Sequence, residues 1–328
     1  MKINIQDGLR AASSWNGSGI SSSTHVVQMI ESGGEVSKIL GPVIYLLDRY
    51  FLSVPALKRL SDINSDGGDI VIVTKAKINC RAYEKPVVKP GAKGRKPKKG
   101  KKHVLENYFK HGKFLSAKAS MYGKDNQDVQ YCCKNFLWGN GLYQELRFVM
   151  VKYNGMKSIL VTTDTNMDPI TVIELYSQRF SIENFFREYK QQAGGFGYHF
   201  WTKHISKLNH YAKTTEPDRL EKVTNENSRQ RILATIKAIE GFVLFGSISF
   251  GIIQMIALDE TVDGEVSQGR YLRTRSQIKV SEATVRRFLQ KKLFALMMLH
   301  PTSLITINIR KHQKVESGSY ISENSNVA

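Results

Sequence analysis

The most informative stretch of this chain is YSQRFSIENFFREYK, residues 176–190. Its periodicity predicts one continuous α-helix, in which successive residues turn by about 100°. Four polar side chains then fall within about 60° of one helix face: Tyr176, Arg179, Glu183 and Lys190. A carboxylate beside two cations can bind a metal ion while the cations hold the phosphates of a phosphodiester. The alternative interpretation is an ordinary amphipathic helix whose polar face is only solvated.

The neighbouring face of the predicted helix is apolar and is expected to point into a hydrophobic core. It carries Leu175, Ile182, Phe185, Phe186 and Tyr189. The polar face would then lie at the edge of a cleft, where a substrate can reach it.

A second carboxylate, Asp48, directly follows the apolar run VIYLL at residues 43–47. A short apolar run between helical segments predicts a buried central strand. The end of such a strand places a carboxylate at a sheet edge with fixed geometry. Oxygen ligands of this kind suit Mg²⁺, which takes few protein ligands and keeps water and phosphate as the others. The alternative for Asp48 alone is a turn residue at a strand end.

The rest of the chain alternates between strand and helix signals. Further strands are predicted at residues 69–74, 127–138, 142–153 and 156–161, with Asn154-Gly155 as a hairpin turn. Helices are predicted through residues 25–30 with Ser23 or Thr24 as cap, at 53–63 with Ser53 as N-cap, at 229–258 and at 281–299. Asp168 and Pro169 are expected to cap and open the helix that contains the first stretch.

The composition favours a polyanionic partner. The 328 residues carry 48 Lys and Arg against 29 Asp and Glu, a formal net charge of +19, and nucleic acid is the usual partner of so basic a chain. The cysteines Cys80, Cys132 and Cys133 lack a zinc-like spacing, which favours a reducing cytoplasm over a disulfide scaffold. No signal peptide is visible, and the apolar stretch 242–258 is short for a membrane span, so a buried core helix is expected there.

Residues 83–103 are dense in Lys and Arg and are interrupted by Gly and Pro, which excludes regular structure. Arms of this kind run along phosphate backbones, where each neutralised phosphate adds salt-dependent affinity. The predicted DNA-binding residues of this arm are Arg95, Lys96, Lys98 and Lys99. The alternative is a solvated flexible loop without a role.

The spacing Tyr-x2-Arg-x3-Glu-x6-Lys within residues 176–190 resembles the signature of the insertion sequence 4 family of bacterial transposases. These are DDE enzymes with a ribonuclease H-like core. Asp48, which is followed by an Arg, an aromatic residue and Ser53, is similar to the family's second catalytic Asp. The resemblance covers about residues 3–300.

The resemblance implies an α/β fold, in which a ribonuclease H-like mixed sheet is flanked by helices. It also implies a β-rich insertion domain before the helix that bears Glu183. The expected segments are a partial core at 1–80, the insertion with the basic arm at 81–168, core completion with C-terminal helices at 169–300, and a polar tail at 301–328.

The resemblance further implies the chemistry. Asp48 and Glu183 would hold Mg²⁺ or Mn²⁺, and two ions about 4 Å apart would activate the attacking water or 3′-hydroxyl and stabilise the leaving oxygen. Arg179 and Lys190 would contact DNA phosphates near the scissile bond, and Tyr176 would position the strand. The implied partner is double-stranded DNA, at transposon ends and target. A synaptic homodimer would bind it in the bacterial cytoplasm, at the nucleoid, without a membrane partner.

One departure from the family pattern concerns the first catalytic Asp. The upstream candidate is Asp7, but residues 8–24 are too polar to hold the two core strands expected between it and Asp48. Residues 2–6 look like the third core strand instead, so the chain is interpreted as an N-terminally truncated transposase with impaired activity. Asp164 is a spare ligand for which a turn role is favoured.

Two other interpretations stay open. In the first, the chain is a non-catalytic DNA-binding remnant that keeps the basic arm and the insertion domain. It would bind DNA without metal-dependent nicking, and Asp48→Ala would change neither property. In the second, it is a stand-alone ribonuclease H-like nuclease that uses Asp7 as the missing ligand, so that Asp7→Asn abolishes activity.

Overall fold

The computed structural model describes Trp15 and residues 24–87, 94–199, 202–205, 219–259, 280–304 and 306–311. These residues form two compact units, one that ends at Phe185 and one that begins at Phe186. The predicted strand at residues 2–6 and the carboxylate of Asp7 lie outside the described residues.

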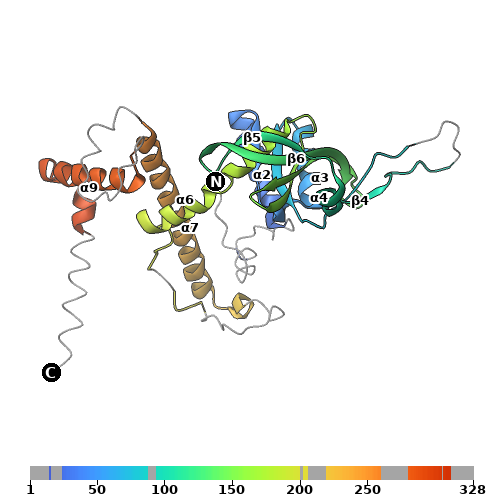
Figure 1. Ribbon diagram of the computed structural model, residues 1–328. Helices are drawn as coiled ribbons and strands as arrows, with labels where there is room; N and C mark the ends of the chain where they lie inside the picture. The colour runs from blue at the N-terminus through green and yellow to red at the C-terminus, as the bar shows by residue number, and fades with distance from the viewer. Residues whose placement is uncertain are drawn as a thin grey trace, which may run out of the picture. The chain divides into compact units, whose positions relative to one another are not determined.

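The first unit is built around one mixed sheet (Figure 1). Its strands run in the order β1-β2-β8-β7-β6-β3-β4, and β5 pairs with β6. Their bounds are β1 Val43–Leu46, β2 Ile70–Ala76, β3 Arg81–Tyr83, β4 Lys102–Val104, β5 Leu115–Met121, β6 Lys124–Trp138, β7 Gln144–Tyr153 and β8 Met156–Thr162. Strands β1 and β2 are parallel, and the other pairs of described strands are antiparallel. The predicted mixed α/β sheet is confirmed.

Both faces of the sheet are covered, because its apolar residues alternate between two cores. On one face, Phe148 of β7 packs in a core with helices α2 (His25–Leu40) and α3 (Val54–Ser65). On the other face, Val149 packs in a second core with helix α5 (Pro169–Gln178). Both side chains are fully buried, so the sheet provides a rigid base for residues at its strand ends.

Local sequence signals predicted two helix starts and one hairpin turn of this unit correctly. The Ser53 hydroxyl accepts a hydrogen bond from the Ala56 N–H at 3.3 Å, which caps α3. The Asp168 carboxylate accepts hydrogen bonds from two N–H groups at the start of α5. Asn154 and Gly155 join β7 to β8 with φ angles of 46° and 75°, as a tight hairpin requires.

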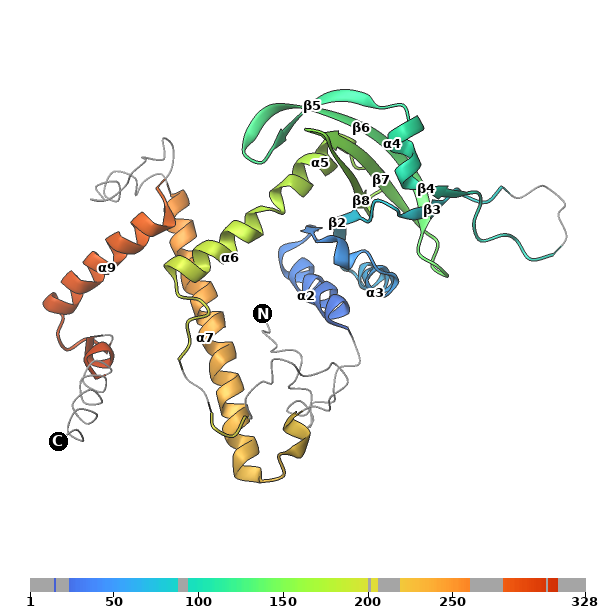
Figure 2. The ribbon, with the colours of Figure 1, turned by 60° about the horizontal axis from the view of Figure 1, so that its bottom comes forward.

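The predicted single helix across residues 176–190 is wrong, because a turn divides it (Figure 2). Helix α5 ends at Gln178, and α6 (Ser181–Gln192) begins after Arg179 and Phe180. The N–H groups of Arg179 and Phe180 bond to carbonyls three residues back rather than four. This 3₁₀-type pattern tightens the backbone, and Tyr176 therefore lies on a different helix from Glu183.

The predicted core-facing stripe is only partly right. Ile182 and Phe186 are 49% and 44% exposed, whereas Tyr189 is 1% exposed. The turn changes the face that α6 presents. Apolar residues spaced for one continuous helix therefore do not share one buried face.

The strands of segment 81–168 continue the sheet that begins with β1 and β2. Strand β2 pairs with β8 from Val73 opposite Thr162 to Ala76 opposite Ile159. The segment that the sequence treats as an insertion thus shares its backbone hydrogen bonds with the core strands. The described parts of its arm, residues 84–87 and 94–101, extend away from the sheet between β3 and β4 in both views (Figures 1 and 2).

The second unit is helical in its described part. It contains the end of α6, a 3₁₀ turn at Arg219–Lys222, α7 (Glu226–Leu258) and α9 (Glu282–Leu299). Tyr189 joins α6 to α7: its hydroxyl donates a hydrogen bond to the Val243 carbonyl at 2.9 Å, and its ring lies 5.9 Å from that of Phe250.

Helix α7 is the one described helix that is long and apolar enough to cross a membrane, by length and composition only. The mean hydropathy of its apolar window is 2.0, but core helices of other proteins reach such values, so this is weak evidence. Only 6% of that window is buried. The predicted buried core helix at 242–258 is therefore wrong for the described part of the chain.

Candidate active site and nucleic-acid interface

Asp48 lies where strand β1 leaves the sheet. The backbone around it is fixed on both sides, because the Leu47 N–H donates to the Val73 carbonyl and the Thr74 hydroxyl donates to the Asp48 carbonyl, each at 2.9 Å. One carboxylate oxygen accepts the Arg49 N–H at 2.7 Å and so starts a 3₁₀ turn, Arg49–Phe51. The side chain itself is exposed, which leaves it accessible to a metal ion or a substrate.

The other signature residues gather at the turn between α5 and α6. Arg179 donates a hydrogen bond to the Glu183 carboxylate at 3.1 Å, and its guanidinium lies 6.0 Å from the centre of the Tyr176 ring. The Arg179 side chain is 23% exposed and that of Glu183 is 53% exposed. The turn thus keeps the ion pair together although the helix is interrupted.

Electrostatic effects connect Asp48 to this group. Burial raises the pKa of the Tyr176 phenol, Arg179 lowers it, and the charge of Asp48 raises it again. Burial lowers the pKa of the Arg179 guanidinium, but its neighbours raise it by more, so that it ends above its ordinary value. These neighbours are Tyr176, Glu183 and Asp48. Asp48 therefore lies within electrostatic reach of Tyr176 and Arg179.

Lys190 lies two turns beyond Glu183 on α6. It is exposed, and its ammonium lies 5.6 Å from the centre of the Phe196 ring. Seven residues on one helix return to nearly the same face, so α6 presents Glu183 and Lys190 on one side.

The donor set fits a hard divalent cation but does not form a complete cage. Among the described residues, no group of three or more His, Cys, Asp or Glu side chains could hold a metal ion. Asp48 and Glu183 carry carboxylate oxygens of the kind such a cation takes, and Arg179 lies within electrostatic reach of both. Mg²⁺ commonly takes one or two carboxylates and completes its octahedron with water and substrate phosphate.

A family model described as the transposase DDE domain matches residues 21–241, about two thirds of the chain. The chain belongs to this family. The matched residues include the whole group just described, from Asp48 to Lys190. No curated protein and no solved structure matches the chain. Membership identifies a DDE transposase with a ribonuclease H-like fold, and it implies a DNA substrate and divalent metal ions.

The basic arm of the transposase is exposed where the structure describes it. Arg95, Lys96 and Lys98 all lie on the surface. The fourth predicted cation, Lys99, is also exposed, but its ammonium lies over two tyrosine rings at the root of the arm. The structure thus separates three solvent-facing cations from one that also makes an internal contact.

Two tyrosines that the sequence did not single out anchor the arm of the transposase. The ammonium of Lys99 lies 4.3 Å from the centre of the Tyr83 ring and 5.0 Å from that of Tyr143. A hydrogen bond with Lys99 lowers the pKa of Tyr143, and the same contact raises the pKa of Lys99. Beside them, Lys85 and Glu145 form an ion pair at 2.7 Å. The arm therefore leaves the sheet from a fixed root.

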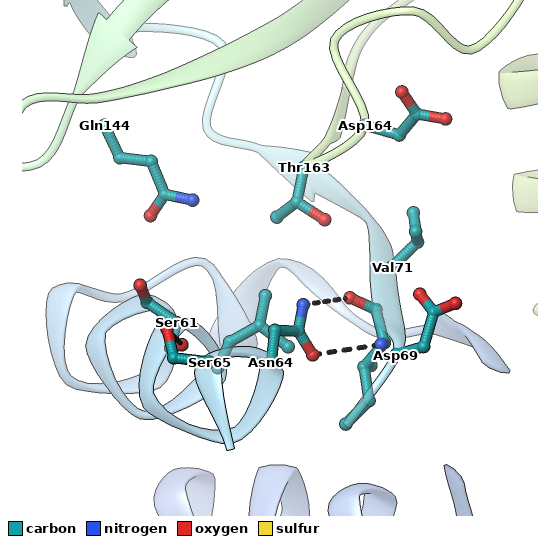
Figure 3. Close-up of a pocket in the computed structure, with 10 residues that line it drawn as sticks. Ser61, Asn64, Ser65, Asp69, Val71, Gln144, Thr163 and Asp164 are labelled. Atoms are coloured by element: carbon teal, nitrogen blue, oxygen red, sulfur yellow. Dashed lines mark hydrogen bonds between the residues drawn. The ribbon is translucent and has the colours of Figure 1, made fainter. Parts of the chain in front are cut away.

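A polar pocket of about 360 Å³ lies at the start of β2, where Asp69 and Val71 line it (Figure 3). Asn64 fixes its wall with two hydrogen bonds to the backbone of Ile70. Asp164 also lines it and accepts the Asn166 N–H at 2.8 Å. This hydrogen bond confirms the turn role favoured for Asp164.

Proposed function

We propose that this chain is a transposase polypeptide of the insertion sequence 4 family that binds double-stranded DNA and uses Mg²⁺ or Mn²⁺ to cleave and join DNA strands. The observation that carries the proposal is the electrostatic link between Asp48 and the Arg179–Glu183 ion pair. This link supports one site built from residues 131 positions apart in the chain, Asp48 and Arg179. The Tyr-Arg-Glu-Lys spacing supports this subfamily.

Asp48 and Glu183 are the proposed metal ligands. A bound ion would polarise the scissile phosphate and activate the attacking water or 3′-hydroxyl. In the structure Arg179 holds the Glu183 carboxylate. Once the carboxylate binds the cation, the guanidinium becomes available to a phosphate oxygen, for which its planar donors are well suited. Tyr176, packed beside it, would position the DNA strand.

The basic arm and α6 supply the remaining DNA contacts in this proposal. Arg95, Lys96, Lys98 and Lys99 would neutralise backbone phosphates and so bind without base readout. Lys190, two turns from Glu183, would contact a phosphate near the scissile bond. The transposon ends and the target would be held by a homodimer in the cytoplasm, at the nucleoid, without a membrane partner.

The same observations support a second candidate, a non-catalytic DNA-binding remnant. The favouring observation is that the described residues provide no three-ligand metal group, whereas DDE chemistry uses three carboxylates. The interpretation that the chain is a truncated and impaired copy, and its division at residues 80, 168 and 300, remain predictions.

Plasmid nicking tests the proposal. Supercoiled DNA is incubated with the protein and Mg²⁺ or Mn²⁺, and DNA affinity is measured in parallel. We expect metal-dependent nicking that Asp48→Ala and Glu183→Ala abolish while DNA binding persists. Salt-sensitive binding without metal-dependent nicking would favour the remnant instead.

A further inference from the structure

The hairpin between β5 and β6 has an unusual residue at its tip. Tyr122 and Gly123 form its two-residue loop, with φ angles of 55° and 74°. A loop with positive φ at both positions favours Asn-Gly, because most side chains are strained there. The β7–β8 hairpin of the same sheet uses that preferred pair, Asn154-Gly155. A strained tyrosine in the first hairpin therefore points to a role for its side chain.

The Tyr122 ring bridges the sheet and the turn between α5 and α6. Its centre lies 6.3 Å from that of Tyr153 on β7 and 6.4 Å from that of Phe180, which it meets edge to face at 85°. Phe180 is 48% exposed, so about half of its surface remains open to solvent beside this contact. A second contact fixes the same hairpin to α5, since the Ser120 N–H donates to the Glu174 carboxylate at 2.8 Å.

Phe180 lies next to Arg179 in the turn, and Arg179 holds Glu183. Such a turn is held by hydrogen bonds to carbonyls three residues back, which are weaker than those of an α-helix. Its side-chain contacts therefore decide how firmly it is fixed. Tyr122 is also close enough to raise the pKa of Tyr176 through its charge, a smaller effect than that of burial.

We propose that Tyr122 is a positioning residue of the active site. By packing against Phe180 it fixes the Arg179–Phe180 turn, so that Arg179 and Glu183 face Asp48. The contact needs the aromatic ring and not the hydroxyl. This inference rests on the proposed function of the carboxylates and assigns a role to a hairpin outside the signature.

Two substitutions at the same position separate positioning from stability. Tyr122→Phe keeps the ring. Tyr122→Asn removes it and installs the residue that the loop favours, so its melting temperature should equal or exceed that of the wild type. Asn154→Tyr is the matched control, because it places a strained tyrosine in the other hairpin and leaves the rings of Tyr122 and Phe180 unchanged.

The first readout is hydrogen exchange of the amides from Phe180 to Glu183. We expect Tyr122→Asn to speed this exchange by about tenfold or more, and Tyr122→Phe and Asn154→Tyr to leave it unchanged. The second readout is metal-dependent nicking, for which Tyr122→Asn should lower kcat about tenfold with little change in KM for DNA, and Tyr122→Phe should not.

A wild-type rate of hydrogen exchange in Tyr122→Asn would overturn the proposal. A loss of kcat in Tyr122→Phe equal to that in Tyr122→Asn would overturn it as well. If the wild-type protein does not nick DNA, the proposed function fails, but the exchange of the turn still tests the position of Tyr122. The two failures are therefore distinguishable.

Discussion

Arg179 donates its hydrogen bond to Glu183 across 3.1 Å from a turn, not from within a continuous helix. The pair therefore depends on how the turn is held as well as on its own charges. Asp48 adds a second carboxylate within electrostatic reach of the same guanidinium. One cation balances two carboxylates, and this charge arrangement is the basis of the predictions about the site.

Replacing Arg179 should change the titration of its neighbour. Burial raises the pKa of Tyr176 and Arg179 lowers it, so Arg179→Gln should raise that pKa further. Because the pKa of Tyr176 is then higher in the folded than in the unfolded protein, its contribution to the stability of the fold is present below about pH 10. That contribution is lost as the pH rises through the folded pKa. NMR of ring-labelled tyrosine measures the shift, with Tyr176→Phe to assign the signal. An unchanged or lowered pKa would contradict the described contact.

Neutralising the arm should weaken DNA binding and reduce its dependence on salt. A triple Gln variant at Arg95, Lys96 and Lys98 should lower the slope of log K against log salt by up to about 2.7, since each phosphate contact contributes about 0.9. Fluorescence anisotropy with a labelled duplex measures both quantities.

A charge-matched control neutralises Lys58, Lys110 and Lys124, which are exposed on other parts of the same unit. We expect a smaller change in slope from this control than from the arm variant. Equal slopes for the two variants would mean that the arm binds DNA no better than any basic surface.

The cap of α5 should contribute measurably to stability. The Asp168 carboxylate accepts the Ile170 and Thr171 N–H groups at 2.9 and 3.1 Å, and loss of such a cap costs about 1 kcal/mol. Asp168→Ala should lower the free energy of unfolding by about that amount, whereas Asp168→Asn should retain most of it. Urea denaturation measures both, and an Ala variant as stable as the wild type would refute the capping role.

A methyl group at Gly195 should disrupt the packing of the second unit. A Cβ built there would overlap the buried ring of Tyr189, so Gly195→Ala should cost on the order of 1–3 kcal/mol, as overpacked positions do. Gly241→Ala is the control, since a Cβ there meets no neighbour. Calorimetry compares the two variants, and the prediction is wrong if both unfold at the wild-type temperature.

The sequence predicts caps and the hairpin turn well because each depends on a few adjacent residues. Strand positions are predicted less well, since β1, expected as a buried central strand, lies at the edge of the described sheet with Ile44 45% exposed. Ser53, Asp168 and Asn154-Gly155 all carry local signals that the structure confirms. The turn at Arg179 escaped prediction, because a periodicity of about 100° per residue continues across it and does not register a change in hydrogen bonding.

Contacts between residues distant in the chain could not be predicted in the same way. Tyr122 meets Phe180 across 58 positions, and Lys99 meets Tyr143 across 44. Neither pair has a distinctive spacing. The first depends on the packing of α5 against the sheet beside β5, and the second on the pairing of β3 with β4 and β6. The one local signal was Tyr122-Gly123 itself, where a loop that favours Asn carries an aromatic residue.

The most direct test of the central claim is the binding of Mn²⁺, measured by electron paramagnetic resonance, to the wild type, Asp48→Asn and Glu183→Gln. If both carboxylates hold one metal site, each single variant should bind Mn²⁺ about tenfold or more weakly than the wild type. The affinity of the double variant should then be little lower than that of the single variant that binds Mn²⁺ less tightly. Wild-type affinity in both single variants would show that these carboxylates do not form a metal site.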